Sequence, residues 1–210
     1  MIYIKEKTLA EAWRKSFKEL HAKGKESQES EFYRFSYAVI EITDTSSTTD
    51  LYDAHFPMSQ ENITTINNYL ITGEKENEVI HDWTKLYRQR LFSEDYNQVE
   101  SIIEYLGKKP SGKRAQMSIW NQQIDLYGEI GPCLQIIWLQ IMNGKLEMHV
   151  HMRASDCYGK LLMNMNEFIA LQNYIAKRLN IQCGSYIQFT DSLHFNSTDK
   201  AVVDKLVNEI

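Results

Sequence analysis

The chain has 210 residues and lacks the features that mark membrane and secreted proteins. No run of apolar residues is long enough to cross a bilayer, and residues 1–7 lack the long apolar core of a secretion signal. The three cysteines, Cys133, Cys157 and Cys183, are odd in number and widely spaced, which argues against a disulfide framework or a CxxC zinc site. These absences predict a cytoplasmic protein that has no membrane partner.

An excess of basic charge is also missing. The formal net charge is -5, which disfavours general binding of nucleic acid, so an anionic ligand would have to meet a local cluster of Arg and Lys. Hydrophobic residues make up 43% of the chain, enough for a full core. The length suits a single domain over residues 1–210.

Helical periodicity is clearest near the amino terminus. Thr8 and Glu11 have the spacing of a capping box, and apolar residues then recur at helical intervals up to Leu20, which predicts a helix that ends near Gly24. Similar patterns predict helices over residues 59–71, 74–91, 97–106, 164–179 and 198–209.

Strand-like segments fall between these helices. Alternating or β-branched patterns predict strands over residues 32–43, 115–120, 134–142, 146–153 and 185–190. The pair Asn143–Gly144 is typical of a two-residue hairpin turn, so the third and fourth of these strands should pair. The pattern indicates an α+β fold in which helices pack on a sheet.

Residues 131–196 bring a thiol, a guanidinium, a carboxylate, an amide and an imidazole into one short piece of chain. Cys133 begins an apolar strand and could be a buried, inert thiol or a nucleophile. A nucleophile needs a nearby cation to favour the thiolate, and Arg153 ends the strand that folds back along Cys133. Spacing alone leaves both interpretations open.

The other polar residues also have two interpretations. Arg153 and Asp156 could pair at the surface, and Asn164 could simply be a helix N-cap, with Glu167 completing a capping box. His194 could be structural rather than catalytic. Lys113 and Arg114 could form a solvated turn or a phosphate clamp.

A rival site is a metal centre. His149 and His151 lie two apart on a predicted strand, so they project from the same face and could hold a transition metal if His194 or an acid supplied a third ligand. A polar sheet face explains the same pair without a metal, and we expect no metal here.

Several motifs occur together in a fixed order. They are Ser111-Gly112-Lys113-Arg114-Ala115, Trp120-Asn121, Gly131-Pro132-Cys133, Asn143-Gly144-Lys145-Leu146, Met152-Arg153-Ala154-Ser155-Asp156, Asn164 and Asp191-Ser192-Leu193-His194. Together they resemble the thymidylate synthase family, which includes deoxycytidylate hydroxymethylases. Residues 8–20 and 32–43 look similar to its short, archaeal-type members.

The resemblance implies an α+β sandwich with a mixed sheet and a homodimer packed sheet to sheet. It also implies transfer of a one-carbon unit from 5,10-methylenetetrahydrofolate to C5 of a uracil nucleotide, with dUMP to dTMP as the first expectation. Cys133 would add covalently at C6 of the base. Tyr87 would assist removal of the proton at C5.

The remaining roles are also those that the resemblance implies. Arg153 would lower the pKa of the thiol and contact the nucleotide phosphate, together with Lys113 and Arg114 across the dimer interface. Ser155 would also bind the substrate. Asn164 would read the O4/N3 edge of uracil, and His194 and Asn196 would face the sugar. Asp156 and Trp83 would hold the folate.

The chain departs from the family pattern at several places. Asn196 replaces a sugar-contacting tyrosine, and Ala154 replaces a serine. No glutamate precedes Gly73 where the family has a catalytic one, and Arg34 is the candidate for an amino-terminal phosphate-binding arginine. Two alternatives follow: a pyrimidine nucleotide hydroxymethylase, or a catalytically weak relative that binds nucleotide or RNA.

Overall fold

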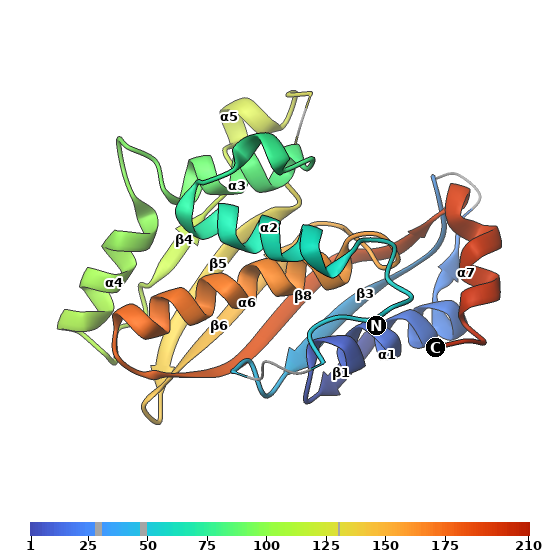
Figure 1. Cartoon of the computed structure of the whole chain (residues 1–210), viewed down its shortest axis with the longest axis horizontal. Helices are drawn as coiled ribbons and strands as arrows, with labels where there is room; N and C mark the ends of the chain where they lie inside the picture. The colour runs from blue at the N-terminus through green and yellow to red at the C-terminus, as the bar shows by residue number, and fades with distance from the viewer. Residues whose placement is uncertain (28–30, 47–49, 130) are drawn as a thin grey trace.

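The computed structural model describes residues 1–27, 31–46, 50–129 and 131–210. Its centre is a mixed sheet with strand order β1-β3-β8-β6-β5-β4 (Figure 1). The strands are β1 (Ile2–Glu6), β2 (Lys25–Glu26), β3 (Phe32–Ile42), β4 (Gln116–Ser118), β5 (Leu134–Met142), β6 (Lys145–Met152), β7 (Ser155–Asp156) and β8 (Gln182–Asn196). The helices are α1 (Leu9–Lys23), α2 (Gln60–Thr72), α3 (Asp82–Leu91), α4 (Gln98–Lys108), α5 (Gln122–Asp125), α6 (Leu161–Arg178) and α7 (Lys200–Leu206).

The predicted hairpin forms between β5 and β6. Asn143 and Gly144 both have positive φ, at 51° and 75°, as the favoured two-residue turn requires. The resulting register brings the end of β6 beside the start of β5, with Leu134 opposite Met152. The chain then crosses over through α6 to β8, which is parallel to β6 and antiparallel to β3.

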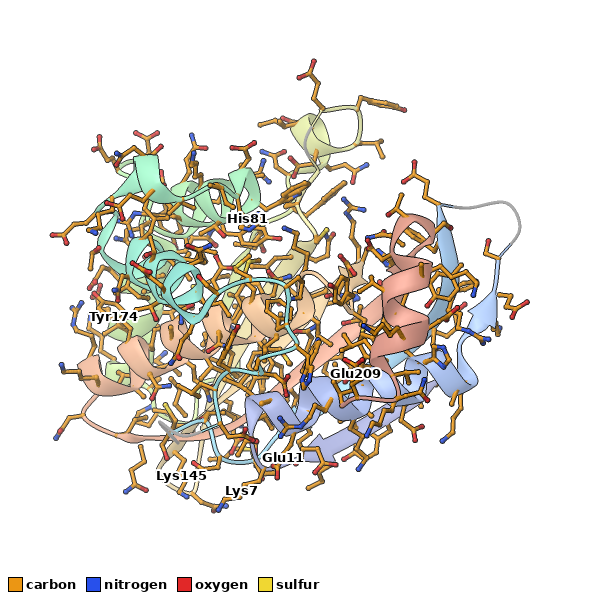
Figure 2. All side chains as sticks on the ribbon, turned by 45° about the vertical axis from the view of Figure 1, so that its right-hand side comes forward. Lys7, Glu11, His81, Lys145, Tyr174 and Glu209 are labelled. Carbon is orange, nitrogen blue, oxygen red and sulfur yellow. The ribbon has the colours of Figure 1, made fainter. Side chains whose placement is uncertain are left out.

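Only one face of this sheet supplies the main core. α6 lies across it in Figure 1, in front of β5, β6 and β8, and α2 packs against α6, while α1 packs on β1 and β3. Inward residues such as Val150 and Ile40 are fully buried, whereas Tyr3, Tyr37 and Phe189 leave 57%, 57% and 42% of their area exposed. In Figure 2 Lys7 and Lys145 lie at the periphery of the molecule, as exposed charged residues should.

The predicted helix starts at Thr8 and Ser59 are confirmed. The Thr8 side chain and Glu11 form both bonds of a capping box, and the Ser59 hydroxyl accepts a hydrogen bond from the backbone N–H of Asn62. α2 ends at Gly73 in the left-handed conformation, with φ at 76°, which glycine adopts without strain.

Several details of the predicted secondary structure are wrong. Residues 74–91 are not one helix but a short 3-10 turn (Glu76–Glu78) followed by α3. The amino-terminal strand β1 was missed, and β8 is much longer than residues 185–190. The final helix α7 is shorter than residues 198–209.

The predicted helix cap at Asn164 is also wrong. α6 begins at Leu161, so Asn164 lies inside its first turn, and Glu167 lies in its interior. Leu161 and Leu162 are fully buried. Because their packing in the core stabilises helical structure before Asn164, the helix begins earlier than the capping pattern at Asn164 and Glu167 predicts.

The prediction of a mixed sheet with helices packed on it is confirmed. Within the four described ranges, no helix combines the length and the apolar character needed to cross a membrane.

Candidate active site

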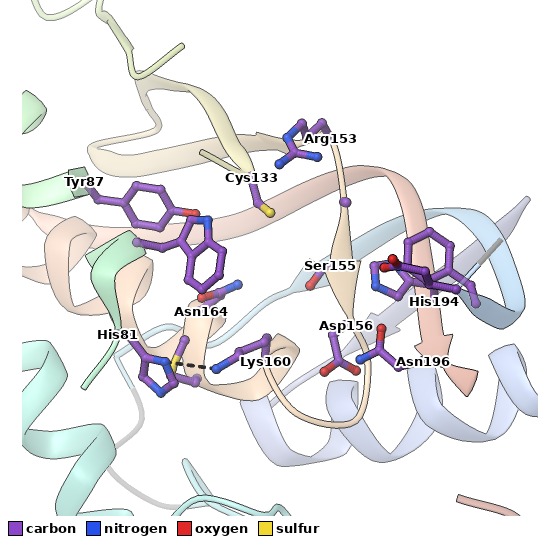
Figure 3. A pocket seen from close by; sticks show the side chains of 15 residues that line it. His81, Tyr87, Cys133, Arg153, Ser155, Asp156, Lys160, Asn164, His194 and Asn196 are labelled. Atoms are coloured by element: carbon purple, nitrogen blue, oxygen red, sulfur yellow. Dashed lines mark hydrogen bonds between the residues drawn. The ribbon is translucent and has the colours of Figure 1, made fainter. Parts of the chain in front are cut away.

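A cavity of about 420 Å³ opens where α3 and the start of α6 meet the start of β5 and the end of β8 (Figure 3). Nine of the predicted site residues line it: Trp83, Tyr87, Cys133, Arg153, Ser155, Asp156, Asn164, His194 and Asn196. Glu31, Phe32, His81, Ala154, Lys160 and Met163 complete the lining. The cavity therefore gathers side chains from distant parts of the sequence.

Cys133 and Arg153 are neighbours across the β5–β6 hairpin. The backbone N–H of Arg153 donates to the carbonyl oxygen of Cys133 over 2.9 Å. The guanidinium turns back on the same loop and donates to the carbonyl oxygens of Pro132 and Gly131 over 3.1 and 2.8 Å. Burial raises the pKa of the Cys133 thiol, and the charge of Arg153 opposes that rise.

Arg153 makes no ion pair with Asp156, so the interpretation of these two as a surface pair is wrong. Asp156 instead accepts a hydrogen bond from the backbone N–H of Tyr158 over 3.0 Å. Burial raises the pKa of its carboxyl group, which the backbone donors partly offset. The carboxyl group faces the cavity in Figure 3.

Tyr87 packs directly behind the thiol. Its side chain is only 2% exposed, and its hydroxyl oxygen accepts a hydrogen bond from the backbone N–H of Leu134 over 3.2 Å. Burial, reinforced by the nearby Cys133 and Glu167, raises the pKa of this phenol well above its ordinary value. The hydroxyl therefore stays protonated and can donate.

Asn164 presents an amide in the wall of the cavity. It is 7% exposed, and within the described part of the chain its side chain makes no hydrogen bond. A buried amide with an unused donor and an unused acceptor can read the edge of a planar ligand.

His194 is held by two contacts. Its Nδ1 donates to the carbonyl oxygen of Ser192 over 3.0 Å, which leaves Nε2 as an acceptor, and its ring stacks on Phe32 with 3.8 Å between ring centroids. Burial lowers the pKa of the imidazole, which favours the neutral form. Asn196 bonds weakly to Asp199 over 3.4 Å.

Several residues of the cavity wall were not predicted, among them Lys160 and His81, which contact each other. Lys160 donates a hydrogen bond from Nζ to Nδ1 of His81 over 3.0 Å, across the cavity from Arg153 (Figure 3). Burial, together with the charge of Lys160, lowers the pKa of His81 to about 4. Lys160 precedes Asn164 by one helical turn and could have been found had the start of α6 been predicted correctly.

Lys113 and Arg114 are exposed and do not line the cavity of this chain. Arg34 also lies elsewhere, where it donates to the carbonyl oxygen of Gly24 and to Glu26.

The His149 and His151 pair lies on the outward face of the sheet. His151 bonds to Asp191 over 2.9 Å, and His149 packs beside Trp138. Among the residues that the structure describes, no three His, Cys, Asp or Glu side chains are grouped closely enough to hold a metal ion.

Comparison with known families agrees with the geometry of the cavity. Residues 58–209 match the family model described as thymidylate synthase, and the chain belongs to that family. The matched segment contains every lining residue except Glu31 and Phe32.

Similar proteins bear related names. A "Putative thymidylate synthase" of Methanocaldococcus jannaschii is 32% identical over 150 residues, 66% of this chain and 65% of that protein, just under two thirds of its length. A "Putative thymidylate synthase" of Methanosarcina barkeri is 23% identical over 99% of this chain and 95% of its own length. A "Deoxyuridylate hydroxymethyltransferase" of Bacillus phage SP01 is 27% identical over 53% of this chain and 30% of its own length.

Proposed function

We propose that this protein transfers a one-carbon unit from 5,10-methylenetetrahydrofolate to C5 of a uracil nucleotide, with dUMP to dTMP as its reaction. The observation that carries this proposal is that one cavity holds the Cys133 thiol, the Arg153 guanidinium and the Asn164 amide. Membership of the thymidylate synthase family supports it.

Cys133 is the nucleophile. C5 of uracil is a weak nucleophile until a thiolate adds at C6. The new S–C6 bond then pushes the electron pair of the C5–C6 bond onto C5 and the O4 carbonyl. Arg153 favours the thiolate because its positive charge lowers the pKa of Cys133 against the effect of burial.

Asn164 selects the base. Its carbonyl oxygen accepts from N3–H of uracil and its amide N–H donates to O4, a pattern that cytosine cannot match with the same amide orientation. The unused hydrogen-bonding groups of Asn164 inside the cavity support this role.

His194, Asn196 and Ser155 bind the sugar and phosphate side of the nucleotide. The neutral His194 has a free Nε2 acceptor for a sugar hydroxyl. Ser155 is 3% exposed and its hydroxyl has no partner among the described residues, so a ligand oxygen can satisfy it.

Asp156 and Trp83 bind the folate. The Asp156 carboxyl group lies in the cavity wall and can accept hydrogen bonds from the N–H groups of a pterin. The Trp83 indole is 41% exposed and lines the same cavity, so its ring offers a surface on which a flat heterocycle can stack.

The active form is a homodimer that packs through the outward face of the sheet. That face carries exposed aromatic side chains, among them Tyr37 and Phe189, together with the half-buried Trp138. The Trp138 indole donates to the backbone carbonyl of Lys113 over 3.1 Å, which ties the turn carrying Lys113 and Arg114 to this face. In the dimer these two cations enter the cavity of the partner and contact the nucleotide phosphate.

Complementation tests the dimer. A mixture of Cys133→Ser chains with Lys113→Ala/Arg114→Ala chains, unfolded and refolded together, should regain about a quarter of wild-type activity if half of the chains form mixed dimers with one intact site. The two variants refolded separately should stay inactive. Absence of recovery in the mixture would contradict the shared site.

Hydroxymethylation is the second candidate, because a similar phage protein bears the name deoxyuridylate hydroxymethyltransferase. Both reactions pass through an exocyclic methylene on C5. Hydride then gives the methyl product, and water gives the hydroxymethyl product.

Tritium release from nucleotide labelled at C5 tests the proposed function. The assay uses dUMP, UMP and dCMP in parallel with methylenetetrahydrofolate, and mass analysis then separates the methyl from the hydroxymethyl product. We expect release from dUMP and the methyl product. Binding of nucleotide without release from any substrate would instead indicate a catalytically weak relative.

A further inference from the structure

Lys160 places an ammonium group in the wall of the cavity, at the start of α6. The side chain is partly buried, and within the described part of the chain its Nζ has a single polar partner, Nδ1 of His81, over 3.0 Å. That partner is neutral, so the positive charge of Lys160 is not balanced by a carboxylate at hydrogen-bond distance. A partly desolvated cation of this kind is stabilised by an acceptor that a ligand brings.

His81 fixes the direction of the ammonium group. An ammonium group has donors and no acceptor, so Lys160 donates and the imidazole accepts in its neutral form. Only one of the three N–H bonds of Nζ is used in this contact, and the others remain for a ligand. Burial lowers the pKa of Lys160, against the effect of Asp156, which makes the group a stronger donor than an exposed lysine.

The ammonium group lies next to the amide proposed to read the base. The backbone N–H of Asn164 donates to the carbonyl oxygen of Lys160 over 2.9 Å, so the two residues are one turn apart on α6, and both line the cavity. In Figure 3 the Lys160 side chain extends from α6 toward His81. Lys160 therefore reaches the part of the cavity that holds the O4/N3 edge of a bound uracil.

The position of His81 indicates which oxygen of the base Lys160 meets. Trp83, which the proposed function assigns to the folate, follows His81 by two residues and lines the same cavity. Lys160 is thus on the side from which the folate approaches C5. O4 is attached to the ring atom next to C5, whereas O2 lies at the opposite end of the ring.

O4 is also the atom on which charge develops. When the Cys133 thiolate adds at C6, its electron pair forms the S–C6 bond. The π electrons of the C5–C6 bond then shift to C4–C5, and those of the C4–O4 bond move onto O4. The negative charge of the thiolate is thereby transferred to this oxygen, and a donor placed there in advance lowers the barrier.

Arg153 and Lys160 are the lysine and arginine residues among the described residues that line the cavity. The guanidinium of Arg153 donates to two backbone carbonyl oxygens of the loop that carries Cys133. Burial lowers the pKa of both His81 and His194, which favours their neutral forms. Lys160 is therefore the cation that remains for O4.

We propose that Lys160 is a catalytic residue that stabilises the negative charge on O4 of the uracil while Cys133 adds at C6. The inference rests on the proposed function and deepens it. His81 is a positioning residue, because it holds Nζ without touching the base. No proton is transferred in this step, since the ammonium group keeps its protons and donates one hydrogen bond to the oxygen.

The first test isolates this step by leaving out the folate. Reversible addition of Cys133 lets dUMP exchange its C5 hydrogen with deuterium from heavy water, which NMR of the nucleotide measures. Exchange by Lys160→Met should be about 100-fold slower than by wild type, with a much smaller change in the Kd of dUMP. Lys160→Arg, which keeps the charge, should recover part of the rate. Lys177→Met, at an exposed position in the last turn of α6, should match wild type.

Nucleotides that carry sulfur in place of one oxygen locate the contact. Sulfur is a weak hydrogen-bond acceptor, so it gains little from the ammonium group. The difference in exchange rate between wild type and Lys160→Met should shrink with 4-thio-dUMP and persist with 2-thio-dUMP. Equal rates of the two proteins on dUMP, or a difference that shrinks only with 2-thio-dUMP, would overturn the proposal.

Infrared spectra of bound dUMP labelled with carbon-13 at C4 decide independently of turnover. The C4–O4 stretch should lie at lower frequency in wild type and Lys177→Met than in Lys160→Met. Equal frequencies in wild type and Lys160→Met would overturn the contact. If wild type bound dUMP without releasing tritium from C5, the proposed reaction would fail and the infrared result would still decide whether Lys160 contacts O4. Absence of dUMP binding to wild type would overturn both.

Discussion

The backbone N–H of Arg153 donates a hydrogen bond to the carbonyl oxygen of Cys133 over 2.9 Å. This bond continues the β5–β6 pairing one residue beyond the strands and fixes the guanidinium beside the loop that carries the thiol. The cation is therefore placed by backbone pairing rather than by a flexible loop, so its effect on the thiol is built into the sheet.

Replacing Arg153 with Gln should make Cys133 less reactive. Burial then raises the pKa of the thiol without an opposing positive charge, so less thiolate is present at a given pH. Alkylation by iodoacetamide at pH 8, in a Cys183→Ser background, should be several-fold slower. Arg178→Gln, at an exposed position on α6, serves as the control. Equal alkylation rates for Arg153→Gln and wild type would show that Arg153 does not lower the pKa of Cys133.

Replacing Asn164 with Asp should move base preference from uracil toward cytosine. A protonated Asp donates where the amide accepts, so it matches N3 of cytosine. The ratio of kcat/KM for dCMP to that for dUMP should rise at least tenfold, as one good hydrogen bond predicts. The exposed Asn180→Asp variant should leave the ratio unchanged. If the ratio stays constant in Asn164→Asp as well, the side chain does not read the base.

Replacing Lys160 with Met should raise the pKa of His81. The ammonium group lies 3.0 Å from Nδ1 and disfavours a second positive charge on the ring. Burial is the larger cause, so the pKa should rise above about 4 but stay below its ordinary value of 6.5. NMR titration of the ring protons measures it, and a pKa that does not move would show that the two groups are not coupled.

Replacing Glu167 with Gln should stabilise the protein near neutral pH. The pKa of this carboxyl is raised from 4.5 to about 8 by folding, so the unfolded chain loses the proton first and stability falls as the pH rises between these values. At pH 7 the free energy of unfolding should increase by up to about 3 kcal/mol, since one pKa unit corresponds to about 1.4 kcal/mol.

Urea denaturation at pH 5, 6 and 7 measures this effect. Wild-type stability should fall relative to Glu167→Gln over this range. A parallel pH dependence of the two proteins would mean that Glu167 titrates normally.

The sequence predicted the arrangement around Cys133 well because short-range signals determine it. Asn143–Gly144 specifies the hairpin turn, and the turn specifies the register that brings Arg153 to Cys133. Once this register is fixed, Ser155 and Asp156 must lie beside the same loop.

Positions that depend on tertiary packing were predicted less well. Asn164 has the local chemistry of a helix cap, but burial of Leu161 and Leu162 carries α6 one turn further upstream and turns Lys160 into the cavity. His81 lies within residues 74–91, which the sequence predicted as a single helix. In the structure α3 begins only at Asp82, so His81 is the residue that precedes the helix. Glu167 is an acidic residue at a fully buried helix position, where the pattern predicts an apolar residue. Such departures from the expected pattern are typical of functional sites.

The central claim is covalent addition of Cys133 to the nucleotide, and trapping of that adduct tests it most directly. A 5-fluoro uracil nucleotide carries fluorine where the C5 proton must leave, so the reaction should stop with Cys133 bonded to C6. With methylenetetrahydrofolate present, intact mass analysis after denaturation should show wild-type chains heavier by the mass of one nucleotide plus one folate. Cys133→Ser should show no increase. A wild-type chain of unchanged mass, or an equal adduct on Cys133→Ser, would contradict the mechanism.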